Sequence, residues 1–268
     1  MDFPIENESG TRRRTGSRQA RPSPRSSSFP RKYGVAKSST WATRVETGGR
    51  SPRSFPLLML RPYQTTFDVT NPAQPLLMGA YTNTTAKTLD VVGTAVYVCD
   101  GLLRILSASS PASLTEIGGI DLGNFPDQIR VAGGFAFVAF GREGFKVVAV
   151  SNPSSPVVRA TVKGVGRVNG VAITGNVALT GNDGGGMDTV DVSNPARPVA
   201  LGHIGTEPVS NIAVLGNTAV LVNYGDEVVS IVDVAQPAMP VLRSTYTALK
   251  WVGSLILGSE PCACGFNS

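Results

Sequence analysis

Short apolar runs, broken by turns rich in glycine and proline, dominate the chain from residue 63 onward. The clearest stretch contains four such runs, at Val168–Thr174, Val177–Thr180, Asp188–Val192 and Val199–Ile204. They are separated by the turn Gly175-Asn176, the glycine-rich loop 181–186 and the proline turn 193–198. No stretch of helical period lies between them. Runs of this length, rich in β-branched residues and joined by tight turns, predict four antiparallel strands.

The same pattern returns about every 40 residues. Five prolines keep the register, with spacings of 39, 42, 42 and 42 residues: Pro72, Pro111, Pro153, Pro195 and Pro237. A glycine follows each of them by 21 or 22 residues: Gly93, Gly133, Gly175, Gly216 and Gly258. A period near 40 indicates stacked units that cannot bury their faces alone. Four short strands per unit are typical of a blade of an all-β β-propeller.

The residues around the prolines carry a more specific resemblance. The clearest copies of the repeated pattern are Val229-Ser-Ile-Val-Asp-Val234, Thr189-Val-Asp-Val-Ser-Asn-Pro195 and Phe67-Asp-Val-Thr-Asn-Pro72. This pattern resembles the LVIVD repeat family over about residues 63 to 258, with the weakest copy at 107–114. The resemblance implies a propeller from a bacterial or archaeal protein that is often exported or surface-attached. The family has no shared catalytic motif, so no functional residue is transferred from it.

The ends of the array predict five blades. Residues around Thr65–Val69 and Leu76–Tyr81 resemble third and fourth strands, and Ser254–Gly258 arrives in the phase of a first strand. We therefore expect the two ends of the chain to share one blade, which would remove the exposed edges. The second strand would have to be Ser259–Phe266, which does not resemble the other second strands. A fragment of a larger propeller, or a truncated product without independent function, is the alternative.

Residues 1–61 differ in composition from the propeller, which we place at residues 62–268. They hold thirteen Lys/Arg against four Asp/Glu, a net of +9, whereas the remainder has a net of −4. Few large apolar residues are present, so we expect a disordered segment. A solvated tail, a gene-start artefact or replaced export signal, and an arm for anionic surfaces are the interpretations. Clustered arginines attract phosphates regardless of sequence, but we expect no nucleic-acid partner.

Few residues in the chain could carry catalysis. The single histidine, His203, lies on a predicted fourth strand, and we interpret it as a structural residue because no second histidine supports a site. Cys99 is interpreted as a small buried residue. The Cys262-Ala-Cys264 pair lacks the four ligands of a zinc site. The loop Asp183–Gly186 lacks the lysine and the helix of a phosphate-binding loop. We expect no cofactor and no bound metal.

Three acids recur at one position, just before the proline turn: Asp68, Asp191 and Asp233. Their recurrence predicts a structural role, in which each carboxylate accepts backbone N–H groups of the turn.

A ligand site, if present, is expected at one mouth of the central channel, beside the first strands. Four polar residues that differ between blades stand six residues before the marker glycines: Lys87, Asp127, Asn169 and Ser210. They are the candidate ligand-binding residues. The alternative is that they line a water-filled channel without binding anything.

The regular array without a catalytic constellation predicts a non-enzymatic module for recognition or scaffolding. Its partner would be another protein or a cell-surface component, and the chain itself a monomer. The rival is an enzyme of the lactonase or hydrolase kind, with Asp and Asn at the channel mouth and a divalent cation. No apolar run has the length of a membrane span, and no signal peptide is visible. The family resemblance suggests an extracellular or cell-surface location.

Overall fold

The computed structural model describes residues 42–46, 54–60, 63–68, 74, 76–82, 86–110, 112–124, 126–163, 166–223 and 225–247. Every described residue belongs to the second of the two units into which the chain divides, Met1–Lys37 and Ser38–Ser268. Twenty strands in this part of the chain form five antiparallel sheets of four, and in each sheet the strands lie in chain order. The predicted all-β propeller with four strands per repeat is confirmed.

The strands have the following bounds. The first sheet comprises β1 (Ala42–Glu46), β2 (Ser54–Leu60), β3 (Tyr63–Asp68) and β4 (Leu76–Tyr81). The second comprises β5 (Thr88–Val92), β6 (Ala95–Cys99), β7 (Leu102–Ser107) and β8 (Thr115–Asp121). The third comprises β9 (Gln128–Ala132), β10 (Phe135–Ala139), β11 (Phe145–Ala149) and β12 (Val157–Val162). The fourth comprises β13 (Val168–Thr174), β14 (Val177–Asn182), β15 (Gly186–Asp191) and β16 (Val199–Ile204). The fifth comprises β17 (Asn211–Leu215), β18 (Thr218–Asn223), β19 (Val228–Asp233) and β20 (Val241–Thr247).

The marker glycines form the hairpin turns between first and second strands. Gly93, Gly133, Gly175 and Gly216 have φ values of 60°, 57°, 53° and 56°. This left-handed conformation strains residues with a Cβ and matches the twist of a two-residue hairpin. The recurrence of glycine in the sequence is therefore a requirement of the turn.

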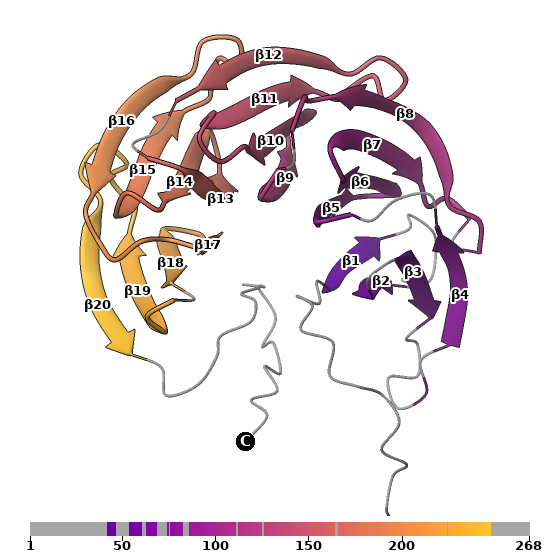
Figure 1. Cartoon of the computed structure of the whole chain (residues 1–268), viewed down its shortest axis with the longest axis horizontal. Coiled ribbons are helices and arrows are strands. Elements are labelled where there is room, and N and C mark those ends of the chain that lie inside the picture. Colours follow the sequence, from indigo (N-terminus) through magenta and orange to yellow (C-terminus); the bar gives the residue numbers. More distant parts are fainter. Residues whose placement is uncertain are drawn as a thin grey trace, which may run out of the picture. The chain divides into compact units, whose positions relative to one another are not determined.

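Consecutive sheets pack face to face, with their first strands innermost and their fourth strands outermost (Figure 1). The first strands contact one another in chain order, from β1 to β5, β9, β13 and β17. Apolar side chains fill the spaces between sheets. Between the second and third sheets, for example, Leu103 and Ile105 pack in one buried cluster with Ile129 and Val138. The second, third and fourth sheets are thus apolar on both faces, which explains the nearly continuous apolar runs in their sequence.

The acids before the proline turns have the predicted structural role. The carboxylate of Asp191 accepts the backbone N–H of Ser193 at 2.8 Å, and that of Asp233 accepts the N–H of Ala235 at 2.8 Å. The bond from Ser193 lowers the pKa of the Asp191 carboxyl. The pKa of Asp233 is lowered chiefly by Arg243 and then by the turn. The side chain of Asp68 lies outside the described residues.

The proline turn of one sheet lies against the fourth strand of the sheet before it. Gly118 in β8 approaches the turn of the third sheet so closely that a Cβ would lie 1.8 Å from the carbonyl oxygen of Pro153. Gly202 in β16 approaches the turn of the fifth sheet in the same way, with Ala238 O at 2.6 Å from a Cβ. The turns therefore join neighbouring sheets at the rim, and glycine is needed beneath them.

The start of the propeller differs from the predicted boundary at residue 62. Strands β1 and β2 lie at residues 42–60, and they pair with each other and with β3. The Arg-rich average composition of residues 1–61 conceals the run Ser54–Leu60, whose apolar residues are typical of a strand. The predicted disorder of residues 1–41 concerns a part of the chain that lies outside the described residues.

The predicted sharing of one blade by the two ends of the chain is corrected. The first sheet takes all four strands from residues 42–81, so its first and second positions are occupied by β1 and β2. The predicted strands at Ser254–Gly258 and Ser259–Phe266 lie outside the described residues. The prediction was wrong because it relied on Gly258, which keeps the spacing of the repeat. This spacing alone does not show which segment of the chain supplies a given strand of the sheet.

Replacing Gly118 with Ala tests the packing of turns on fourth strands. We expect a loss of about 1–3 kcal/mol in the free energy of unfolding, because the Cβ must displace the backbone of Pro153. Chemical denaturation measures this loss. The matched control is Gly205→Ala, where a Cβ meets nothing within 4 Å. Equal stability of the two variants would contradict the packing.

Candidate functional site

The four predicted mouth residues lie at or just before the first strands of four consecutive sheets. Lys87, Asp127 and Ser210 immediately precede β5, β9 and β17, and Asn169 is the second residue of β13. Backbone bonds hold the first three on the adjacent second strand, from Lys87 N to Cys99 O at 2.8 Å, Asp127 N to Ala139 O at 2.9 Å and Ser210 N to Val222 O at 2.8 Å. The repeat therefore places Lys87, Asp127 and Ser210 alike, whereas Asn169 lies further along its first strand.

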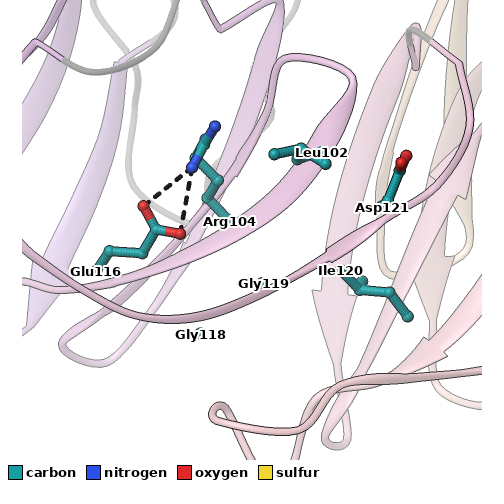
Figure 2. Close-up of a pocket in the computed structure, with 7 residues that line it drawn as sticks. All are labelled: Leu102, Arg104, Glu116, Gly118, Gly119, Ile120 and Asp121. Carbon is teal, nitrogen blue, oxygen red and sulfur yellow. Dashed lines mark hydrogen bonds and ion pairs between the residues drawn. The ribbon is translucent and has the colours of Figure 1, made fainter.

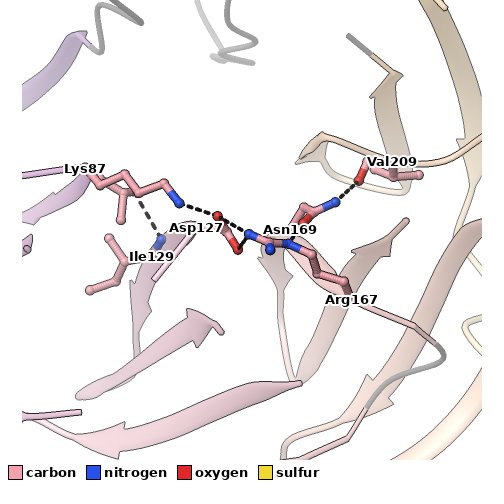
Figure 3. Close-up of polar contacts among 7 residues, drawn as sticks. Lys87, Asp127, Ile129, Arg167, Asn169 and Val209 are labelled. Atoms are coloured by element: carbon pink, nitrogen blue, oxygen red, sulfur yellow. Dashed lines mark hydrogen bonds and ion pairs between the residues drawn. The ribbon is translucent and has the colours of Figure 1, made fainter. Parts of the chain in front are cut away.

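Asp127 is the centre of a charged cluster at these strand ends (Figure 3). Lys87 Nζ from the second sheet pairs with Asp127 Oδ1. Arg167, just before β13 of the fourth sheet, donates from Nη2 to both carboxylate oxygens, at 3.1 Å to Oδ1 and 2.9 Å to Oδ2. One carboxylate of the third sheet thus holds a cation from each neighbouring sheet.

The network continues into the fifth sheet through Asn169 (Figure 3). Arg167 Nε donates to Asn169 Oδ1 at 2.9 Å, and Asn169 Nδ2 donates to the carbonyl oxygen of Val209 at 3.1 Å. The structure therefore brings Lys87, Asp127 and Asn169 into one polar network. Ser210 follows Val209 in the sequence, and the carbonyl oxygen of Val209 accepts the hydrogen bond from Asn169. We call these side chains, with Arg167, the mouth network.

Arg167 is the member of the mouth network that the sequence prediction missed. The signal was present, since Lys87, Asp127 and Arg167 follow one another at intervals of 40 residues. The prediction counted back from the marker glycine and so selected Asn169. Because β13 begins two residues earlier relative to that glycine than β9 does, the ion-pairing position lies two residues before Asn169.

A second polar layer lies one residue further along the first strands. Thr88 Oγ1 accepts the N–H of Ile129 at 3.3 Å, and Gln128 Oε1 accepts the N–H of Val171 at 2.9 Å. Thr88 and Gln128 are each 2% exposed. Each polar side chain therefore serves the first strand of the next sheet, and this layer ties sheets together away from solvent.

Asp90 continues the same layer. Its Oδ2 accepts the N–H of Val131 at 2.6 Å, and its Oδ1 accepts that of Val91 at 3.0 Å. Burial raises the pKa of the Asp90 carboxyl, although Arg130 and the two N–H groups act in the opposite direction. Burial lowers the pKa of the Arg130 guanidinium, which the charge of Asp90 opposes.

A pocket of about 550 Å³ lies on the outer part of the second sheet, beside Arg104 (Figure 2). Arg104 Nη1 donates to both oxygens of Glu116, at 3.2 and 3.1 Å, and its Nε donates to Asp100 Oδ2 at 3.1 Å. Tyr81 donates its hydroxyl to Glu116 as well. The guanidinium and the two carboxylates thus fix one another, and the pocket was not predicted from the sequence.

The remaining predicted residues have the following outcomes. His203 lies on the outermost strand β16 with its side chain 44% exposed, as predicted, but its Nδ1 is 2.7 Å from Asp188 Oδ1, a contact that the sequence did not predict. Cys99 is fully buried and unpaired, as predicted, and burial raises the pKa of its thiol. The loop Asp183–Gly186 joins β14 and β15 as a hairpin. Cys262 and Cys264 lie outside the described residues.

Within the described ranges, no three His, Cys, Asp or Glu side chains come together as a metal-ligating group. The same ranges contain no helix that is long and apolar enough to cross a membrane.

A double-mutant cycle tests whether the mouth network joins sheets energetically. We expect Asp127→Ala and Arg167→Ala to show a coupling of about 0.5–1 kcal/mol in the free energy of unfolding, because the cation is partly exposed. Urea denaturation at low and high salt measures it, and salt should weaken the coupling. As the control, Arg243 and Asp233 lie within one sheet and are more exposed, so they should couple less. Additive effects of the Asp127 and Arg167 substitutions would contradict the assignment.

Comparison with known protein families identifies the repeat. The model of the LVIVD repeat matches residues 126–163, 165–206 and 208–248. These matches cover the third, fourth and fifth sheets, from just before each first strand to the end of each fourth strand. A comparison with curated protein sequences found no match.

Solved structures with the same fold are distant in sequence. A functionally unknown protein from Desulfotomaculum acetoxidans DSM 771 has a TM-score of 0.63 at 14% identity, over 76% of this chain and 70% of that one. The WD40 repeats of RRP9 have a TM-score of 0.62 at 10% identity, over 78% and 67% of the two chains. The computationally designed Ika8 protein has a TM-score of 0.56 at 10% identity, over 76% and 61%. At these identities the likeness shows the fold alone. Three LVIVD repeats therefore make up residues 126–248 of this chain, and its fold is a β-propeller.

Proposed function

We propose that the chain is a non-enzymatic recognition module whose mouth network binds an acidic segment of another protein or of a cell-surface component. The observation that carries the proposal is the arrangement of two cations from different sheets around one carboxylate. These positions differ from blade to blade, so the repeat itself does not require their charges. Charges that differ from blade to blade allow a regular scaffold to complement the charges of one particular partner.

The exposure of the charged groups supports an anionic partner. The side chains of Lys87 and Arg167 are 40% and 44% exposed, whereas that of Asp127 is 13% exposed. The cations therefore face solvent while their carboxylate lies behind them, and the three groups together carry a net charge of +1. Arg167 uses Nε and Nη2 within the network, and its Nη1 has no bond to a described residue. That nitrogen can donate to an incoming carboxylate.

The rival hydrolase would place a divalent cation at Asp127 and Asn169. Both oxygens of Asp127 already face Arg167, and Oδ1 also faces Lys87. A metal ion would have to displace these cations, and the Asn169 oxygen is likewise engaged by Arg167. This arrangement favours recognition over metal-assisted hydrolysis at the mouth.

Binding of a hexaglutamate peptide tests the proposal, with hexalysine as the charge-reversed probe. We expect hexaglutamate to bind in a salt-dependent manner and Arg167→Ala to weaken it about fivefold, the loss of one partly exposed charged contact. Isothermal titration calorimetry measures both. The matched control is Arg159→Ala, an exposed arginine on the outer strand β12, which should bind like the wild type.

Three results would overturn the proposal. The first is hexaglutamate binding that Arg159→Ala weakens as much as Arg167→Ala does, and the second is no binding at all. The third is a clear rise in the melting temperature of the wild type with calcium or zinc, abolished by Asp127→Ala and Asn169→Ala, which would favour the hydrolase.

A further inference from the structure

A separate pocket of about 350 Å³ lies between the third and fourth sheets, away from the mouth network. Its apolar walls come from both sheets, with Phe145 and Val162 on one side and Val190 and Leu201 on the other. Its volume falls within the range of small-molecule sites, which are mostly apolar with a few placed polar groups. Its polar lining residues are Lys163, Thr180, Asp188 and His203.

Three of these polar residues form a row across the fourth sheet. Thr180 in β14 is the direct partner of Asp188 in β15, and Asp188 is the direct partner of His203 in β16. Directly opposed residues of antiparallel strands point to the same face of the sheet. Thr180 is 1% exposed. The fourth sheet therefore supplies a polar row to the wall of the pocket, beside the apolar Val190 and Leu201.

The imidazole of His203 is held in one orientation. Asn182, which is fully buried, donates from Nδ2 to Asp188 Oδ2 at 2.9 Å, and Asp188 Oδ1 lies 2.7 Å from His203 Nδ1. A carboxylate only accepts hydrogen bonds, so the Nδ1 atom carries the proton. In the neutral ring Nε2 is then the acceptor, as in histidines that a carboxylate orients for binding or proton transfer.

The repeat does not require this arrangement. The position of Asp188 recurs every 42 residues and is occupied by different side chains in the neighbouring sheets: Arg104, Lys146 and Ser230. Lys146 spans the gap between sheets and donates to Leu122 O at 2.7 Å. The acid–imidazole pair of the fourth sheet is therefore specific to it.

We propose that this pocket binds a small neutral molecule with an apolar body and one hydroxyl group, such as a phenol. The hydroxyl donates to Nε2 of His203, and the Thr180 hydroxyl completes the polar wall. The apolar body packs against Phe145, Val162 and Leu201. A carboxylate ligand would meet the negative charge of Asp188, and an ammonium ligand would meet Lys163 at the rim, so a neutral donor fits best.

Nuclear magnetic resonance can observe this site directly, because His203 is the single histidine of the chain. In the wild-type protein at mildly alkaline pH, the ¹⁵N shifts should show a proton on Nδ1 and none on Nε2. In Asp188→Asn, which removes the carboxylate but keeps the shape, the ring should revert to the mixture of tautomers of a free imidazole. A proton on Nε2 in the wild type would overturn the proposal.

Ligand binding is tested with p-cresol and its methyl ether, 4-methylanisole, which has the same body but no donor. We expect p-cresol to shift the His203 resonances saturably and 4-methylanisole to bind about fivefold more weakly, the contribution of one hydrogen bond. Ala200→Phe, which narrows the pocket, should abolish the shift. Val199→Phe, on the adjacent residue that does not line the pocket, should leave it unchanged.

Melting temperatures establish that both variants are folded. Equal affinity for p-cresol and 4-methylanisole would contradict the proposal that Nε2 of His203 accepts a hydrogen bond from the ligand. A saturable shift that persists in Ala200→Phe would place the ligand elsewhere, and no saturable shift with either compound would overturn the site. None of these results depends on the mouth network, so they are independent of the recognition proposal.

Discussion

Among the described strands, the first strand of each sheet pairs with another strand on one side only. The rest of the structure depends on how the backbone groups on its other side find hydrogen-bond partners. An edge strand that carries free N–H groups is costly when buried and adhesive when exposed. In the third and fourth sheets the solution is a polar side chain from the preceding sheet. Thr88 and Asp90 accept N–H groups of β9, and Gln128 accepts one of β13. Hydrogen bonds thus connect sheets whose faces are otherwise apolar.

The contacts between sheets described above all involve chain neighbours, and they lie at three levels. Near the centre, buried polar side chains bond to the backbone of the next first strand. At the mouth, Lys87, Asp127 and Arg167 pair across three sheets. At the rim, a proline turn lies on a glycine of the preceding fourth strand, as Pro153 does on Gly118. Because each repeat packs against its neighbours, its side chains can differ from those of the other repeats only where these contacts permit. Both candidate sites lie at such variable positions.

The fold could be predicted from the sequence because the features that define it recur. Hairpin glycines need a left-handed conformation in every repeat, and the proline turns need the same corner. The placement of Lys87, Asp127 and Ser210 at the starts of first strands could be predicted for the same reason, since position in the repeat fixes position in the sheet. Arg167 was missed because the count was made from the marker glycine, and its pairing with Asp127, like that of Asp188 with His203, could not be found in this way. A hydrogen bond between sheets depends on the length and direction of two side chains far apart in sequence, and the repeat specifies only their backbones.

The first two strands show a different limit of sequence reasoning. The composition of residues 1–61 is that of a disordered segment, but composition averages over a window and hides a seven-residue strand such as β2. The strands of the first sheet can therefore be assigned only when their pairing is known. The register between β2 and β3 identifies β2, whereas its surroundings in the sequence do not.

Amide hydrogen exchange of the first strands tests the central claim most directly. If side chains of the preceding sheet satisfy these strands, the amides of Val131 and Val171 should exchange slowly, close to the rate of global unfolding. Asp90→Ala should accelerate exchange at Val131 far more than at Val171. Rapid exchange of both amides in the wild type, as fast as in the exposed turns, would contradict the account.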